Sequence, residues 1–197
     1  MPDADRRTFV LVHGAWHGAW VWRDVLPRLR ALGHEATALT LTGLGERRHL
    51  GNGSLDLETH IEDLVTHIEM EDLRDITLVG WSYGGMVITG GLARVPERIS
   101  RLVYLDAFMP EDGKALVDYI PEDQRWSLEA FKEQNMPLPP IPLSIFGVTD
   151  PHIVAFIEPR LAAQPWRTFY QPVKAMKSRP NIPVSYVVCT GYAISTG

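Results

Sequence analysis

Short apolar segments alternate with amphipathic ones along the first half of the chain. Four of them are rich in β-branched and other apolar residues, which is typical of strands buried in a sheet: residues 8–12, 35–39, 76–79 and 98–105. Two stretches between them, 22–32 and 57–68, carry apolar residues at helical spacing. Strands that alternate with helices predict an α/β fold with a mainly parallel sheet flanked by helices.

Local signals refine these boundaries. Gly33 supplies a stop for the first helix, and Pro27 inside the apolar pattern weakens or kinks it. Asp56 is a candidate N-cap for the second helix. The polar, glycine-rich run from Thr42 to Ser54 is predicted to be a loop.

The second half of the chain has a different texture. Prolines recur between residues 110 and 183, and aromatic residues are scattered there without a strand period. This segment is predicted to be a cap inserted over the carboxyl ends of the strands. Residues 185–189 then resume the sheet. We therefore expect one domain over 1–197, with a core of about 6–110 and 183–197 and a cap of about 111–182.

Composition narrows the protein class. The chain has 197 residues, 45% of them hydrophobic and 22% charged, as is usual for a globular domain. A net charge of −5 gives no excess of positive charge with which to bind nucleic acid. The uncharged stretch 76–93 is long enough for a membrane span, but its five glycines favour a strand, a turn and a close-packed helix instead. We expect no membrane or nucleic-acid partner, and a monomer or homodimer.

The amino terminus and the single cysteine bear on location. The first seven residues are polar, and the apolar run after them is too short for a signal peptide. Cys189 is the only cysteine, so no disulfide can form within the chain, which is compatible with a reducing cytoplasm. It lies in an apolar run and is predicted to be a buried structural thiol. The predicted location is cytoplasmic.

The pentapeptide Gly80-Trp81-Ser82-Tyr83-Gly84 is the strongest chemical signal in the chain. It has the G-x-S-x-G form of a nucleophile elbow, with a predicted strand before it and a helix-forming segment after it. Flanking glycines let the strand and helix pass closely while the serine takes a strained, exposed conformation. Ser82 is therefore predicted to be a nucleophile; the alternative is a simple tight turn.

An acyl-transfer serine also requires an oxyanion hole, in which backbone N–H groups bind the developing negative charge. One donor is the residue after the nucleophile, Tyr83, and the loop that begins at His13 supplies the other, for which we choose Ala15. His13 is predicted to fix this loop by hydrogen bonds rather than to transfer protons. His17 is predicted either to have the same structural role or to line the substrate pocket.

One helix carries a weaker alternative signal. His60, Asp63 and His67 lie at i, i+3 and i+7, a spacing at which a metal site is conceivable. We expect instead a solvated polar face opposite Leu57, Ile61 and Leu64, and no metal.

Several motifs together resemble a known family. They are His13 to Trp20 (HGAWHGAW), Thr42 to Gly45, Gly80 to Gly85, and Tyr104 to Pro110. The chain resembles the α/β-hydrolase branch of plant methylesterases, salicylate-binding esterases and hydroxynitrile lyases, especially its bacterial members. The resemblance runs through nearly the whole chain and implies an α/β-hydrolase fold with Ser-His-Asp chemistry and no cofactor.

Two positions depart from that family. The plant members carry the triad acid after the strand that resembles 185–190, and this chain has no carboxylate there. Asp106, at the end of the preceding strand, is the natural substitute, with a turn-capping role as the alternative. The family's catalytic histidine follows a final strand, and no histidine occurs after His152. The resemblance therefore implies a missing C-terminal strand and helix, and either the histidine lies beyond residue 197 or the protein is a truncated form without its general base. Recruitment of His152 from the cap is the alternative, and it would break the chain order Ser, Asp, His of this fold.

The predicted activity is hydrolysis of small carboxylic esters through an acyl-enzyme. Rivals are a hydroxynitrile lyase, disfavoured because lyases carry a hydroxyl or amide side chain where this chain has Gly14, and a non-catalytic small-ligand-binding protein or truncated hydrolase. The predicted substrate pocket draws on the loop, the elbow and the cap: Trp16, His17, Trp81, Met109 and Trp126, with Phe131, Phe146 and Trp166 as further candidates.

Overall fold

A computed structural model describes residues 6–178 and 181–190 of the chain. Within them, five parallel strands form one sheet in the order β2-β1-β3-β4-β5. The strands are β1 (Thr8–Val12), β2 (Glu35–Leu39), β3 (Ile76–Trp81), β4 (Ile99–Leu105) and β5 (Val184–Val187). The predicted α/β fold with a parallel sheet is confirmed.

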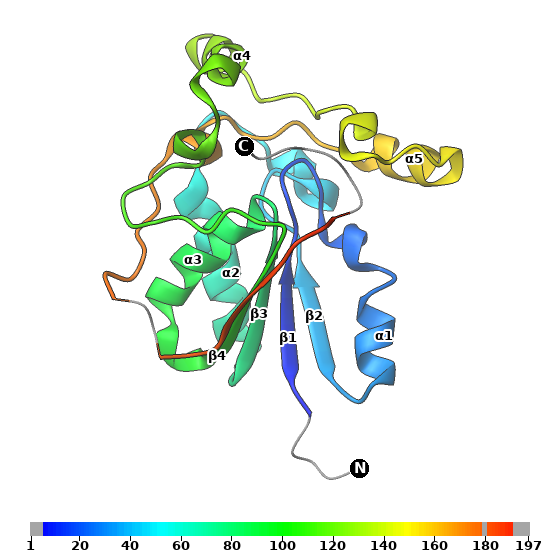
Figure 1. Cartoon of the computed structure of the whole chain (residues 1–197), viewed down its shortest axis with the longest axis vertical. Helices are drawn as coiled ribbons and strands as arrows, with labels where there is room; N and C mark the ends of the chain where they lie inside the picture. The colour runs from blue at the N-terminus through cyan, green and yellow to red at the C-terminus, as the bar shows by residue number, and fades with distance from the viewer. Residues whose placement is uncertain (1–5, 179–180, 191–197) are drawn as a thin grey trace.

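Helices cover both faces of this sheet (Figure 1). Helices α2 (Leu57–Met70) and α3 (Gly84–Arg94) pack on one face, and the short α1 (Leu26–Ala31) lies on the other. The larger buried cluster lies between the sheet and the α2–α3 layer and extends into the cap. The apolar stretch 76–93 therefore divides into β3 and α3, as predicted, and no helix in the described part of the chain is long and apolar enough to cross a membrane.

The capping signals have the predicted consequences, with one difference. The Asp56 carboxylate accepts the Thr59 N–H at 2.9 Å and begins α2. Pro27 does not kink a helix that starts at Trp22; it lies in the first turn of α1, where its missing N–H costs nothing. Residues 19–22 form a separate 3-10 turn, η2 (Ala19–Trp22). The predicted loop 42–54 contains a second one, η3 (Gly45–Leu50), and η4 (Pro96–Arg98) precedes β4.

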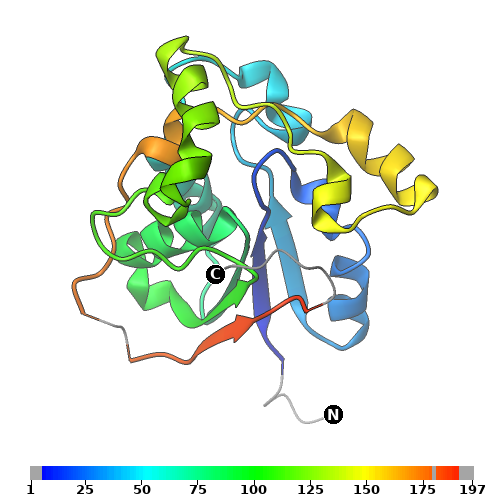
Figure 2. The same ribbon diagram turned by 45° about the horizontal axis from the view of Figure 1, so that its top comes forward.

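The segment between β4 and β5 arches over the carboxyl ends of the strands (Figures 1 and 2). Its helical pieces are η5 (Leu116–Tyr119), α4 (Glu122–Glu133), η6 (Leu143–Phe146), α5 (Pro151–Ile157), η7 (Glu158–Arg160) and α6 (Arg167–Tyr170). Two distant stretches of it meet at an antiparallel bridge between Leu138 and Gln164. This arrangement places irregular chain above the edge of the sheet at which Ser82 lies.

The C-terminal part of the sheet differs from expectation in two ways: the last strand ends at Val187 rather than at residue 189, and Cys189 is not buried. Strand β5 occupies the sheet edge beside β4, and Cys189 follows it with an exposed side chain, so the prediction of a buried thiol is wrong. An edge strand has no further neighbour among the described residues to cover it. Residues 191–197, where a carboxylate was sought, lie outside the described residues.

Candidate active site

Ser82 lies at the tight turn between the end of β3 at Trp81 and the start of α3 at Gly84. Its φ is 52°, a left-handed value that is strained for a residue with a Cβ. The neighbouring glycines are required by space. A Cβ on Gly84 would lie 2.7 Å from the Val12 carbonyl oxygen, and one on Gly80 would lie 2.7 Å from that of Gly84. The turn therefore has the geometry of a nucleophile elbow.

The segment after β4 is hydrogen-bonded to the backbone of this elbow. The Ser82 N–H donates to the Leu105 carbonyl at 3.3 Å, and the Phe108 N–H donates to the Ser82 carbonyl at 3.2 Å. Asp106 lies between these two contacts, with a left-handed φ of 45° and its N–H donated to Val187 at 2.7 Å. Its carboxylate has no hydrogen-bond partner among the described residues. The structure thus places Asp106 in a segment that is hydrogen-bonded to the elbow, and its carboxylate makes no hydrogen bond within the described part of the chain.

The loop after β1 approaches Ser82 from the other side. A Cβ on Gly14 would lie 3.1 Å from the Ser82 Cβ, so only a glycine permits this approach without displacement. The Gly14 carbonyl accepts the His13 Nδ1–H at 2.8 Å, and His13 Nε2 accepts the Leu41 N–H at 3.1 Å. Burial lowers the pKa of His13 to about 3. Both ring nitrogens of this neutral histidine are engaged, so it fixes the loop, as predicted.

His17 fixes the next peptide of the same loop. Its Nδ1 donates to the Ala15 carbonyl at 2.7 Å. Its ring packs edge-on against Trp81 with centroids 4.8 Å apart, and burial lowers its pKa. Both His17 and Trp81 therefore support the loop and the end of β3.

Two buried backbone donors in this region lack acceptors. Ala15 is 3% exposed and Tyr83 is not exposed, and the N–H of neither residue has a hydrogen-bond partner in the described part of the chain. Buried N–H groups without partners are rare in folded proteins. The Tyr83 N–H is also one of the free N–H groups at the start of α3. The loop and the elbow thus each present a buried N–H group without an acceptor among the described residues.

His60 has a position that the sequence reading missed. It is completely buried, and its Nε2 donates to the Thr42 carbonyl at 2.9 Å while its Nδ1 accepts the Tyr83 hydroxyl at 2.8 Å. The expectation of a solvated polar side chain is wrong because His60 lies one turn from Leu57 and Leu64, on the buried face of α2. That spacing was the available signal.

The Asp63 carboxylate also has a structural role. Its carboxylate accepts the Thr42 N–H at 2.6 Å, the Thr42 hydroxyl at 2.8 Å and the Arg47 guanidinium at 3.0 Å. His67 instead meets the Thr37 hydroxyl at 3.3 Å. No cluster of three metal-ligating side chains occurs within residues 6–178 and 181–190.

Comparison with known proteins identifies the family of this chain. A model of the alpha/beta hydrolase family matches residues 9–192. The chain belongs to this family. A carbendazim-hydrolysing esterase of Nocardioides is 54% identical over 114 residues, which are 58% of this chain and 47% of that relative. Methylesterase 2 of Arabidopsis thaliana is 31% identical over 210 residues, with 93% of this chain and 78% of the relative covered.

A solved structure agrees with these sequence relatives. An extracellular alpha/beta-hydrolase from a Paenibacillus species, described as homologous in structure and function to tobacco salicylic acid binding protein 2, is 29% identical with a TM-score of 0.82. The match covers 91% of this chain and 76% of that one. The predicted family resemblance and α/β-hydrolase fold are confirmed. The chain spans about half the length of the Nocardioides relative, 47% of it.

The residues predicted to line the substrate pocket do not all gather in one place. Trp16 is buried against Phe169, with ring centroids 5.9 Å apart. Met109 is 48% exposed and lines a hollow beside α3 and β4. Trp126 is 73% exposed on α4, because Leu128 and Phe131 take the face of that helix that packs on the core. The structure therefore does not bring Met109 and Trp126 to the elbow.

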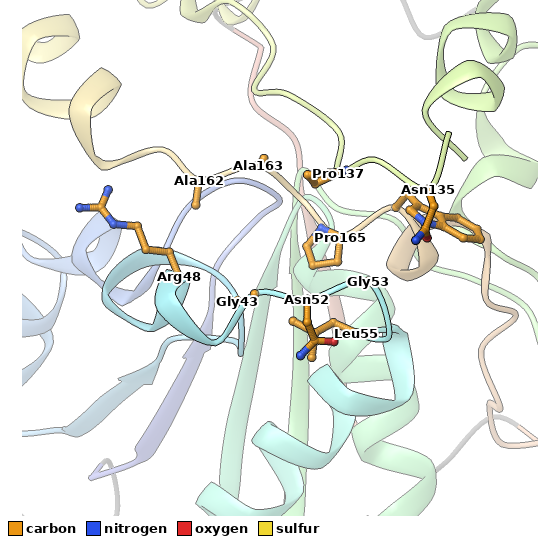
Figure 3. A pocket seen from close by; sticks show the side chains of 12 residues that line it. Gly43, Arg48, Asn52, Gly53, Leu55, Asn135, Pro137, Ala162, Ala163 and Pro165 are labelled. Atoms are coloured by element: carbon orange, nitrogen blue, oxygen red, sulfur yellow. The ribbon is translucent and has the colours of Figure 1, made fainter. Parts of the chain in front are cut away.

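The chain also encloses a cavity of about 430 Å³ between the loop after β2 and the cap (Figure 3). Gly43 and Leu55 of the core face Pro137 and Pro165 of the cap across it. Trp166, a further candidate for the predicted pocket, also lines it. None of the residues predicted to bind the reacting atoms lines it. The cavity is therefore lined by residues other than those predicted to carry out catalysis.

Proposed function

We propose that the protein hydrolyses small carboxylic esters, with Ser82 as the nucleophile. The observation that carries this proposal is the pair of buried, unpartnered N–H groups of Ala15 and Tyr83 beside a strained elbow serine. Ester-hydrolysing relatives support the reaction class.

The reaction has two steps. The Ser82 oxygen attacks the ester carbonyl carbon and loses its proton, and the carbonyl oxygen becomes an oxyanion that accepts the two N–H groups. The carbon–alkoxy bond then breaks, and the alcohol leaves with a proton. Water attacks the acyl-enzyme in the second step, which releases the carboxylic acid and restores the serine.

Serine activation requires a general base, and the family resemblance implies a histidine oriented by an acid. His13 and His60 cannot serve, because both ring nitrogens of each are already engaged. Asp106 is proposed as the acid. Its uncommitted carboxylate and the hydrogen bonds that tie its neighbours to Ser82 support this role.

Ester hydrolysis is favoured over cyanohydrin cleavage by the space next to the nucleophile. A side chain at Gly14 would begin 3.1 Å from both the Ser82 Cβ and the Trp81 ring. The hydroxyl or amide that the lyases carry at this position is thus absent, and the packing here would have to change to admit it.

Covalent labelling of the full-length gene product tests the nucleophile. A fluorophosphonate forms a phosphorus–oxygen bond with the reactive serine and releases fluoride. We expect labelling that Ser82→Ala abolishes and that Ser54→Ala, at an exposed loop serine, leaves intact. Labelling or p-nitrophenyl ester turnover that survives Ser82→Ala refutes the assignment.

The triad acid is tested by Asp106→Asn. Asparagine tolerates the left-handed φ of 45°, so the fold should be retained. We expect the turnover rate to fall by on the order of 10⁴, as when the histidine is held in the wrong tautomer. Near-normal turnover with a native circular dichroism spectrum excludes the role.

A further inference from the structure

Trp16, the residue after the proposed donor Ala15, is held almost entirely by the cap. Its N–H donates to Gln164 Oε1 at 3.0 Å, its carbonyl accepts the Ala162 N–H at 2.9 Å, and its indole N–H donates to the Leu138 carbonyl at 3.1 Å. All three partners lie between β4 and β5. The cap therefore fixes the backbone and the ring of the residue that follows the donor.

Gln164 makes the most direct of these contacts. It is completely buried, and the N–H that it accepts belongs to the Ala15–Trp16 peptide, whose carbonyl is held by His17. Its Nε2 donates to the Thr168 hydroxyl at 2.8 Å, which anchors the amide at the start of α6. The peptide plane after Ala15 is thus fixed from the loop on one side and from the cap on the other.

Tyr83, the second residue with a proposed donor, is also contacted by α6. The Tyr83 hydroxyl is fixed by His60, and the Tyr83 ring stacks on Phe169 with centroids 5.8 Å apart and an interplanar angle of 26°. The other neighbour of Phe169 is Trp16, at 5.9 Å and 67°. Phe169 is 4% exposed, so its ring fills the space between the side chains of Trp16 and Tyr83.

We propose that Gln164 and Phe169 are positioning residues for the oxyanion hole. Phe169 separates Tyr83, which carries one donor, from Trp16, the residue after the other donor. Gln164 fixes the peptide that joins Ala15 to Trp16. The cap thereby contributes to stabilisation of the transition state in addition to any role in binding substrate. This inference rests on the proposed esterase function.

The expected loss of kcat follows from how strongly catalysis depends on the position of the oxyanion donors. Removing one oxyanion donor costs about 10²–10³ in turnover, and a displacement of about 1 Å can cost about 10². Loss of the Phe169 ring shifts donors without removing them. We therefore expect Phe169→Ala to lower kcat by about 10- to 100-fold, with KM for a small ester such as p-nitrophenyl acetate changed by less than about threefold.

A paired substitution tests Gln164 at constant side-chain length. Gln164→Met removes the oxygen that accepts the Trp16 N–H, whereas Gln164→Glu retains one. We expect kcat to fall further in the methionine variant than in the glutamate variant. Leu143→Ala is the control for general destabilisation, because Leu143 is a buried cap residue outside the apolar cluster that contains Trp16, Tyr83 and Phe169.

A binding measurement separates positioning from simple loss of stability. An alkyl boronic acid forms an oxygen–boron bond with the Ser82 hydroxyl, which releases its proton, and the resulting tetrahedral anion occupies the oxyanion hole. Boron NMR distinguishes this adduct from the free trigonal acid. In the full-length gene product, Phe169→Ala and Gln164→Met should weaken the adduct by about as much as they lower kcat.

The outcomes are distinct. If the two cap variants lower kcat and adduct affinity no more than Leu143→Ala does, or change only KM, the positioning role is wrong while the esterase proposal stands. If the unsubstituted protein forms no adduct that depends on Ser82, the proposed function fails and this inference fails with it.

Discussion

Replacement of Gly85 by alanine should disconnect the elbow from the segment that carries Asp106. Gly85 is the second residue of α3, and a Cβ built there would lie 1.9 Å from the Phe108 carbonyl oxygen and 2.9 Å from its carbon. These are backbone atoms, so no side-chain rotation relieves the contact. The segment 106–108 must move away from α3 by more than an ångström, and the 3.2 Å hydrogen bond from Phe108 to Ser82 is then lost.

The cost can be worked from three contributions. Overpacking in a close-packed site costs about 1–3 kcal/mol, and a contact this short belongs at the upper end. The lost hydrogen bond adds about 1 kcal/mol. Alanine in place of glycine within a helix returns about 1 kcal/mol. The unfolding free energy should therefore fall by about 3 kcal/mol. A typical domain has an unfolding free energy of about 5–15 kcal/mol, so the variant should still fold.

Urea unfolding and serine labelling measure the two consequences separately. The matched control is Gly91→Ala in the same helix, where the new Cβ would lie 2.6 Å from a Leu64 methyl carbon, the end of a side chain rather than a backbone atom. We expect the control to unfold within about 1 kcal/mol of the parent and to label normally. The Gly85 variant should lose about 3 kcal/mol and label more slowly. Equal stability and equal labelling in the two variants would refute this account of the elbow.

Three further predictions concern the supporting residues. Because burial lowers the pKa of His13 from 6.5 to about 3, the unfolded chain binds a proton between these values that the folded chain does not. Urea unfolding at pH 7 and pH 5 should therefore show stability falling as the pH falls, by up to about 1.4 kcal/mol per pH unit from this group, and a flat profile contradicts the assignment. Asp63→Asn should lower the unfolding free energy by about 1–3 kcal/mol, since three donors lose a charged acceptor; a change below about 0.5 kcal/mol argues against it. Trp126→Ala should change stability by less than about 0.5 kcal/mol and leave KM unaltered, whereas a raised KM would return this exposed residue to the pocket.

The core of the fold could be predicted because its signals are local. Strands β1, β2 and β4 begin and end within about a residue of the apolar segments that predicted them, and Asp56 caps α2 as expected. The elbow was predictable for the same reason: a serine flanked by glycines between a strand and a helix leaves few backbone arrangements. Local sequence is sufficient where local sterics determine the structure.

The cap could not be predicted in this way. Its contacts join residues far apart in the chain, such as Leu138 with Gln164 and Trp16 with Phe169, and no periodicity records such pairings. Trp126 shows the limit, because an aromatic residue in a cap is as readily exposed as buried until the packed face of its helix is known. His60 is different: its spacing on α2 already placed it on the apolar face, and its polarity obscured that signal.

The cap, which the sequence predicts least well, nevertheless supports the strained loop at Trp16. Trp16 has a left-handed φ of 65°, which costs about 1–2 kcal/mol for a residue with a Cβ. Three hydrogen bonds from the cap, each contributing about 1 kcal/mol, offset that cost. Within the core, the Trp16 backbone has no other hydrogen-bond partner among the described residues. His13 and His17 fix the Gly14 and Ala15 carbonyls from within the loop, whereas the hydrogen bonds of Trp16 itself all go to the cap. We therefore expect undocking of the cap to release Trp16 and to disturb the proposed oxyanion hole beside it.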